Sequence, residues 1–143
     1  FLTNPVHVGA AADLSAEALD DGKVKLTWTA PGDDGDDGSA AWYQVKYSTA
    51  PIVERVSGWP DLTKPLPVDE QQWHERAESF NARQRAFWAA RNVDGEPTPS
   101  RPGARESLIV GGLENGRYYF AIKTWDDGPN ISDLSNVVEA DAE

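Results

Sequence analysis

The chain has 143 residues, of which 39% are apolar and 26% charged, a globular composition with enough length for one buried core. Its 24 acidic and 13 basic residues give a net charge of −11, which disfavours binding to nucleic acid and insertion at anionic membranes. The absence of cysteine excludes disulfides and thiolate metal sites. Because the chain starts at Phe1 rather than Met, we expect a processed product or a piece of a larger protein.

Strand patterns begin after residues 1–12, which show no clear period and predict a linker or N-terminal extension before a domain over 13–143. Segment 23–29 alternates strictly, with Val24, Leu26 and Trp28 on its inward face. Segment 42–48 repeats this pattern, with Tyr43, Val45 and Tyr47 inward and Trp42, Gln44 and Lys46 outward. The stretch 31–38 between them is rich in aspartate and glycine and predicts a loop.

The last third of the chain continues the strand pattern. Leu108 and Val110 alternate, and a longer segment follows with the inward residues Tyr118, Phe120, Ile122 and Thr124. We expect a final strand over about 134–140. Short alternating strands separated by turn clusters predict an all-β, antiparallel β-sandwich of the immunoglobulin-like kind.

The middle of the chain differs and predicts one inserted α-helix. From Asp69 to about Ala90 there is no glycine or proline, and apolar residues share one helical stripe: Trp73, Ala77, Phe80 and Phe87. Asp69 can cap the first turn, and acidic residues precede basic ones as the helix dipole favours. The preceding segment 59–67 has three prolines and predicts an extended chain.

Four segments together resemble the fibronectin type III domains of secreted bacterial proteins: LTWTAPGDDGDDG, YQVKYSTAPI, GEPTPSRPG and ESLIVGGLENGRYYFAIKTWDDGPNISDLSNV. The resemblance runs from about Asp13 to Ala140. It implies a secreted, extracellular or periplasmic location. It also implies that Trp28 anchors the core and that Tyr118, or its neighbour Tyr119, forms the corner at the start of a strand.

The chain is longer than this family needs, because a sandwich of this type takes about 100 residues. The excess lies at about 57–95, between STAPI and GEPTP, where the prolines and the helix occur. The family pattern does not predict this insertion. We expect whatever is specific to this protein to lie there.

Acidic loops are one candidate site, for Ca²⁺ as the only cofactor that the sequence suggests. The family topology implies that two loops meet at one pole, carrying Asp33, Asp34, Asp36, Asp37, Asp126 and Asp127. Ca²⁺ prefers oxygen ligands, but the spacing is not that of an EF-hand. The alternative is that these aspartates make turns and remain solvated.

Surface aromatic residues are the second candidate site, for binding a polysaccharide or a protein. They are Trp42 and Trp125 on outward faces, with Trp59, Trp73, Phe80 and Trp88 in or beside the insertion. Indole rings stack on sugars and anchor protein interfaces. The alternative is that these rings pack between the inserted helix and the sheet.

Catalysis has little support, so we expect no enzyme. His74 stands among Glu70, Glu75 and Glu78, but such a group is more often a solvated helix face. Phosphate loops, GxSxG and HExxH motifs are missing from the sequence. We therefore expect a non-catalytic accessory module that docks or spaces neighbouring domains or subunits of a larger protein. The alternative is a carbohydrate-binding module.

Overall fold

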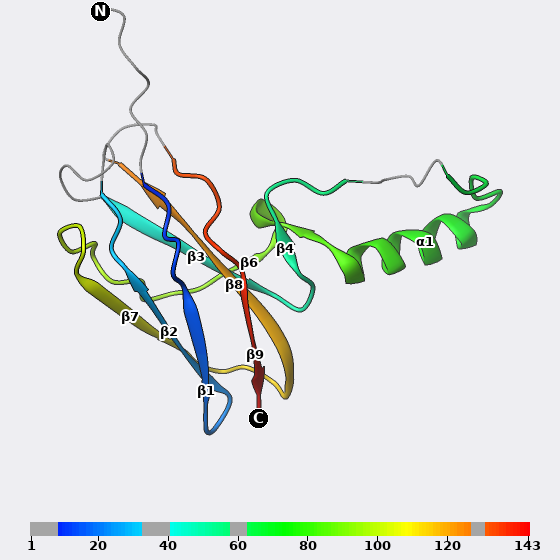
Figure 1. Ribbon diagram of the computed structural model, residues 1–143. Coiled ribbons are helices and arrows are strands. Elements are labelled where there is room, and N and C mark those ends of the chain that lie inside the picture. The colour runs from blue at the N-terminus through cyan, green and yellow to red at the C-terminus, as the bar shows by residue number, and fades with distance from the viewer. Residues whose placement is uncertain (1–8, 33–40, 58–62, 127–130) are drawn as a thin grey trace, which may run out of the picture.

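The computed structural model describes residues 9–32, 41–57, 63–126 and 131–143. Its strands form an antiparallel β-sandwich, as the alternating pattern predicts (Figure 1). One sheet has the order β1-β2-β7, with β1 (Ser15–Leu19), β2 (Lys23–Thr29) and β7 (Arg105–Val110). The other has the order β6-β3-β8-β9, with β6 (Arg91–Asn92), β3 (Trp42–Ser48), β8 (Gly116–Trp125) and β9 (Val138–Ala142).

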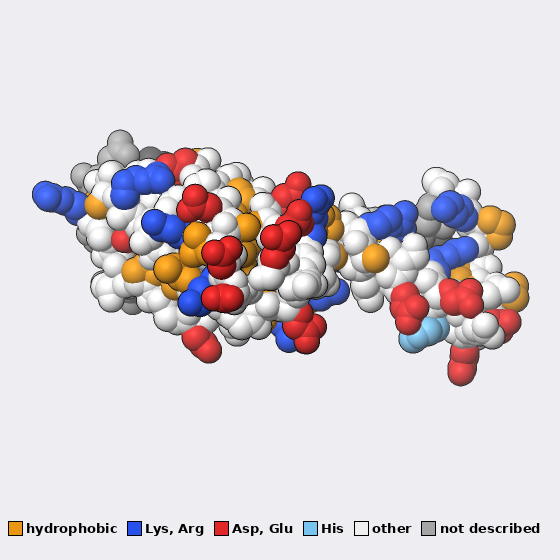
Figure 2. All heavy atoms as spheres, turned by 90° about the horizontal axis from the view of Figure 1, so that it is seen from below, with side chains coloured by type: hydrophobic (Ala, Val, Ile, Leu, Met, Phe, Trp, Pro, Cys, Tyr) orange, Lys and Arg blue, Asp and Glu red, His pale blue; other side chains and the backbone are white. Residues whose placement is uncertain are grey.

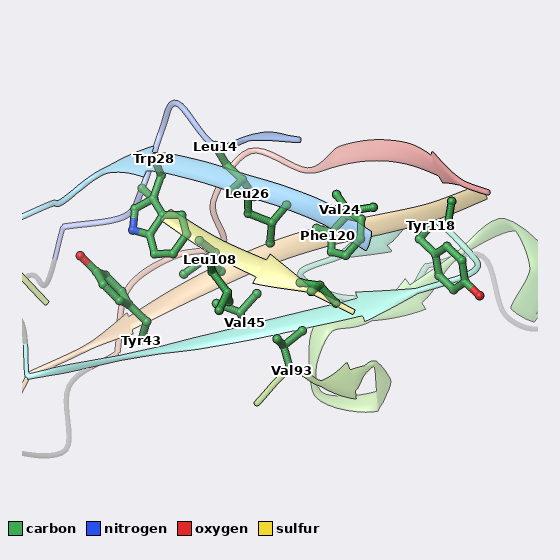
Figure 3. Packing of buried hydrophobic residues seen from close by; sticks show 14 residues of the cluster. Leu14, Val24, Leu26, Trp28, Tyr43, Val45, Val93, Leu108, Tyr118 and Phe120 are labelled. Atoms are coloured by element: carbon green, nitrogen blue, oxygen red, sulfur yellow. The ribbon is translucent and has the colours of Figure 1, made fainter. Parts of the chain in front are cut away.

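The core lies between the two sheets and follows the predicted alternation. Val24, Leu26 and Trp28 of β2 have no exposed surface. From the facing sheet come Tyr43 and Val45 of β3 and Tyr118, Phe120 and Ile122 of β8. Figure 3 shows Trp28 and Tyr43 at one end of this core and Tyr118 at the other. Of the two candidate corner tyrosines, Tyr118 is therefore the inward one, and Tyr119 lies on the outer face.

A buried polar group closes the Trp28 end of the core. The Trp28 and Tyr43 rings meet edge to face, with centroids 5.2 Å apart. The Tyr43 hydroxyl donates a hydrogen bond of 2.9 Å to the buried carboxylate of Glu106, which also accepts from the Ser100 amide at 2.8 Å. Burial raises the pKa of Tyr43 well above its usual range, so the phenol remains a donor.

Asp13 ties the three-stranded sheet together just before β1. Its carboxylate accepts hydrogen bonds from the amide of Thr29 on β2 at 2.8 Å and from the Thr29 hydroxyl at 2.5 Å. Arg105 of β7 donates to the same carboxylate at 3.0 Å. These hydrogen bonds and the Arg105 charge hold the pKa of Asp13 below its ordinary value.

The last strand begins later than the predicted 134–140. The β8 amides of Thr124 and Ile122 donate to the side-chain hydroxyls of Ser132 and Ser135, at 2.9 and 2.8 Å. Because side chains replace backbone carbonyls there, segment 131–137 follows β8 without forming a regular ladder. Regular pairing starts only at Val138.

The inserted helix is present but shorter than predicted. Helix α1 (Glu70–Arg83) begins at Asp69, whose side chain accepts from the Gln72 amide at 2.9 Å. It ends at Arg83 rather than near Ala90, although no glycine or proline stops it. Tertiary contacts end it instead: β5 (Arg85–Ala86) pairs in parallel with β4 (Ile52–Val53), and the 3₁₀ helix Phe87–Ala89 follows. Phe87 is therefore not on the helical stripe.

Residues 63–83, called the arm below, extend away from the sandwich (Figures 1 and 2). Within the arm, Arg76 donates to the Pro65 carbonyl at 2.8 Å and so joins the proline-rich segment to α1. The base of the arm is closed by Ser57 and Gln84. The Ser57 amide donates to the Gln84 side chain at 3.1 Å, and the Gln84 amide group donates back to the Ser57 carbonyl at 3.0 Å.

Across the described ranges, α1 is too short and too polar to span a membrane, and it is the one α-helix there.

Candidate functional site

The outer face of the four-stranded sheet carries three tryptophans, called the tryptophan cluster below: Trp42, Trp88 and Trp125. Trp42 and Trp125 are direct cross-strand partners on β3 and β8. Their rings stack with centroids 4.7 Å apart and planes 5° from parallel. Trp88, from the 3₁₀ helix, meets Trp125 edge to face at 6.3 Å. Side chains that are far apart in sequence thus form one aromatic surface.

This surface remains accessible. Trp42 is 46% exposed and Trp88 is 52% exposed. A polar network fixes the third ring, because the Trp125 indole nitrogen donates to the Gln44 side chain at 3.1 Å. Gln44 in turn faces Asn92 of β6, at 3.5 Å. The cluster therefore offers flat apolar rings bordered by amide groups.

A hollow of about 430 Å³ lies beside the cluster. Its lining includes Trp42 and the polar side chains of Gln44, Asn92, Asp94 and Glu96. The Glu96 carboxylate is held at the edge of the sheet, where it accepts from the Val45 amide at 3.2 Å. An aromatic wall combined with amide and carboxylate groups has the donors and acceptors that sugar hydroxyls need.

Two lysines on this outer face are buried, which the alternation did not predict. Lys46 and Lys123 are 4% and 3% exposed because segment 87–90 covers them. The Lys46 ammonium donates to the carbonyls of Trp88 and Ala90, both at 3.4 Å, and lies 5.3 Å from the Phe87 ring centroid. Its burial lowers its pKa. Lys123 pairs instead with Glu54.

Phe87 holds this covering segment on the sheet. It has no exposed surface and packs with Ile52, Ala90 and Ala121 in a second, smaller apolar group outside the sandwich core. Lys46 and Lys123 both lie over its ring, at 5.3 and 5.6 Å. An aromatic residue of the insertion therefore does pack on the sheet, but it is Phe87, which follows the helix, and not a residue of α1.

The other predicted aromatic residues do not join the cluster. Trp73 is 38% exposed on α1, and Phe80 is buried near the end of that helix. Both belong to the arm, which extends away from the outer face (Figure 1). Trp59 lies outside the described residues.

The predicted Ca²⁺ site cannot be assembled from the described residues, because Asp33, Asp34, Asp36, Asp37 and Asp127 lie outside them. Asp126 is described and is 6% exposed, so it is not a freely solvated loop carboxylate. Among the residues with assigned positions, no three histidine or acidic side chains gather as metal ligands would. The Ca²⁺ site stays a prediction.

His74 lies on the exposed surface of α1. Its imidazole Nε2 is 2.8 Å from a carboxylate oxygen of Glu78, one helical turn later. Both side chains are largely exposed, at 74% and 68%. This is the arrangement of a solvated pair on a helix face.

Comparison with protein-family models and with curated proteins gives no match. Among solved structures, the chain is similar to a β-1,2-glucanase from Parabacteroides distasonis, with 13% sequence identity and a TM-score of 0.47. The similarity covers 96% of this chain but 13% of the glucanase chain. The likeness is thus to a small part of that protein.

Proposed function

We propose that this chain is a non-catalytic accessory module of the fibronectin type III kind, part of a larger secreted or surface bacterial protein. In this proposal the arm docks against a neighbouring domain or subunit. The observation that carries it is the position of α1, which extends away from both sheets (Figure 1) and buries only Phe80 among its 14 residues. Because an isolated helix of this length is marginal in water, a partner surface would stabilise it.

The arm has the surface chemistry of a docking element. Its apolar residues Leu66 and Val68 are 52% and 81% exposed. Lys64, Arg76 and Arg83 line one hollow on the arm. Figure 2 shows acidic side chains gathered along one edge of the arm. Apolar anchors bordered by charges of both signs are typical of protein interfaces, where the charges select the partner and its orientation.

The Ser57–Gln84 pair allows a clean test, because it closes the base of the arm. A variant in which a short glycine linker joins Ser57 to Gln84 removes residues 58–83 and keeps both hydrogen-bonding residues. We expect the excised chain to fold with an unchanged β-sheet circular dichroism spectrum. We also expect the full-length protein with this excision to be cleaved faster by protease beside the module. The matched control is Ile109→Ser, which changes an exposed residue of β7.

The proposal fails if the full-length protein keeps its protease resistance after excision while the excised module still folds. Loss of folding would be a different result, visible in the isolated chain. The two outcomes are therefore separable.

A second candidate function is carbohydrate binding by the tryptophan cluster. It is favoured by the exposed, stacked Trp42 ring and by the polar hollow beside it. Sugar rings would stack on the indoles while their hydroxyls pair with Gln44, Asn92 and Asp94.

The test is a titration of tryptophan fluorescence with a panel of soluble polysaccharides. We expect one of them to change the emission of the native chain and of Trp73→Ala, but to leave Trp42→Ala unchanged. Trp73 is the matched control because it is a partly exposed indole on the arm. Unchanged emission across the whole panel would count against this function.

A further inference from the structure

A second hollow, of about 560 Å³, lies where the base of the arm meets the open end of the sandwich. Its walls come from β3, β8, the insertion and the loop between β7 and β8. The polar residues that line it include Tyr47, Thr49, Arg85, Arg91, Glu114 and Tyr118. The volume is in the range of small-ligand sites, about 300 to 1,000 Å³.

Backbone pairing fixes the two arginines in this hollow, called the arginine hollow below. Arg91 of β6 stands directly opposite Tyr47 of β3, so both residues share the inner side of the sheet at its edge. The Arg85 amide donates to the Pro51 carbonyl at 2.8 Å, which anchors β5 beside β4. The rings of Tyr47 and Tyr118 lie 5.9 Å apart and form the aromatic wall.

The guanidinium groups of Arg85 and Arg91 make no side-chain hydrogen bond or ion pair within the described part of the chain. Both groups therefore have hydrogen-bond donors to give to an added ligand. Among the other arginines of the described residues, Arg105 binds Asp13 and Arg117 binds Asp141, whereas Arg55, Arg83 and Arg101 also make no ion pair. Arg85 and Arg91 differ from these three in sharing one hollow. In the arginine hollow the one lining carboxylate is that of Glu114, which lies exposed on the β7–β8 loop.

We infer that the arginine hollow binds a carboxylate group. The planar fork of a guanidinium matches a carboxylate with two parallel hydrogen bonds, and the hydroxyls of Tyr47 and Tyr118 can donate further ones. A single negative charge suits the site better than a phosphate dianion, because Glu114 and the net charge of −11 repel higher charge.

The carboxylate comes from a docked polypeptide, as an acidic side chain of the partner; this part of the inference rests on the proposed docking function. Arg85 directly follows Gln84, which closes the base of the arm, so the hollow has a residue beside that base. The acidic field of the whole chain weakens the binding of free anions. A carboxylate presented by a polypeptide also brings backbone amide and carbonyl groups that can pair with residues around the hollow, and these contacts offset the repulsion.

The test compares the native chain with Arg85→Gln/Arg91→Gln. The matched control is Arg55→Gln/Arg101→Gln, which makes the same change in net charge away from the hollow. The probes are an end-blocked Gly-Glu-Gly peptide, its Gly-Gln-Gly counterpart and sodium acetate, followed by NMR shifts of the tyrosine ring signals. We expect the glutamate peptide to shift the Tyr47 and Tyr118 signals. The double variant should bind it at least about tenfold more weakly, as the loss of charged hydrogen bonds implies.

Several results overturn the inference. Equal shifts with the glutamate and glutamine peptides show that no carboxylate is recognised. Equal affinity in the Arg85→Gln/Arg91→Gln and control variants shows that the hollow is not the site. Acetate binding as tightly as the glutamate peptide overturns the polypeptide source and indicates a free small carboxylate. The excised chain keeps Arg85 and Arg91. If it binds the glutamate peptide, the arginine hollow recognises a carboxylate whether or not the arm docks against a partner.

Discussion

Trp42 and Trp125 face each other across β3 and β8 as direct register partners, and their indole rings stack almost in parallel at 4.7 Å. A cross-strand aromatic pair of this kind stabilises a sheet by roughly 0.5–1.5 kcal/mol beyond its buried area. Here the pair also orders a surface, because Trp88 and Gln44 both contact Trp125. The rings of the tryptophan cluster are therefore held by contacts within the protein, which would lower the entropy cost of binding a ligand there.

The stacked pair has a direct spectroscopic consequence. Two stacked indoles at this distance couple their electronic transitions, and a twist between the two transition dipoles within the stack turns this coupling into an exciton couplet in the circular dichroism spectrum, which we expect here. In a Trp88→Leu background, which removes the edge-to-face contact with Trp125, Trp42→Leu should remove the couplet and lower the free energy of unfolding by about 1 kcal/mol. Trp73→Leu, the control, should keep it. A couplet that survives in Trp42→Leu/Trp88→Leu would show that it does not come from the Trp42–Trp125 stack.

Phe87 anchors the covering segment, so Phe87→Ala should be costly. The side chain has no exposed surface, and its removal leaves a cavity under Lys46 and Lys123. We expect the free energy of unfolding to fall by about 3–5 kcal/mol, measured by urea denaturation. Trp88→Ala, in the same turn but half-exposed, should cost about 1 kcal/mol. Equal costs for both variants would mean that Phe87 is not the anchor.

Asp13 should make the stability of the sandwich depend on pH in the acid range. Its pKa is lower in the folded chain than its ordinary value of 3.8, so the unfolded chain binds the proton more tightly. The stabilisation is complete above 3.8 and is lost as the pH falls below it through the folded pKa. Asp13→Asn should therefore lower the free energy of unfolding at pH 7 by about 1 kcal/mol, since solvent screens this partly exposed group.

The check on Asp13 is denaturant unfolding of both chains at several pH values. The gap between native and Asp13→Asn chains should shrink as the pH drops below 3.8. A gap that stays constant with pH would mean that the carboxylate charge contributes nothing.

Gly22 should tolerate no side chain. Its φ of 70° lies in the left-handed region, and an added Cβ would come 2.4 Å from the Leu113 carbonyl oxygen. Leu113 in turn donates its amide to the Gly22 carbonyl at 3.1 Å, so the β1–β2 turn and the β7–β8 loop would have to separate. We expect Gly22→Ala to lower the free energy of unfolding by at least about 2 kcal/mol, measured by urea denaturation. Gly95→Ala is the control, because its Cβ would meet open space.

The sandwich was largely predictable from the sequence because alternation is a local signal. Segment 23–29 has the predicted bounds and the predicted inward face. The same logic placed Tyr43, Tyr118 and Phe120 in the core. Strand β1 could not be predicted, because its residues are exposed or only partly buried and its sequence shows no strict alternation of apolar and polar residues.

The insertion was predictable in existence but not in its end point. The capping aspartate and the uninterrupted helix formers located the start of α1 at Asp69. Nothing local marks its end at Arg83, since the β4–β5 pairing and the Gln84 contact to Ser57 depend on residues far along the chain. Phe87 fits the helical stripe in the sequence. In the structure it packs against Ala121 of the sheet instead, and the helix ends before it.

The candidate sites depend on register, which no local pattern supplies. Trp42 and Trp125 could be assigned to outward faces, but only the pairing of β3 with β8 brings them together. The burial of Lys46 and Lys123 follows from segment 87–90, which lies over them after the helix. Arg85 and Arg91 belong to no motif in the sequence. They line one hollow because β5 pairs with β4 and β6 pairs with β3 after the insertion.

The closure of the arm by Ser57 and Gln84 means that the chain departs from the sandwich and rejoins it at one point. We therefore expect that a segment of another length can replace the arm while the pairing of β4 with β5 is kept. The length and sequence of the arm are in this sense independent of the residues that form the core between the two sheets.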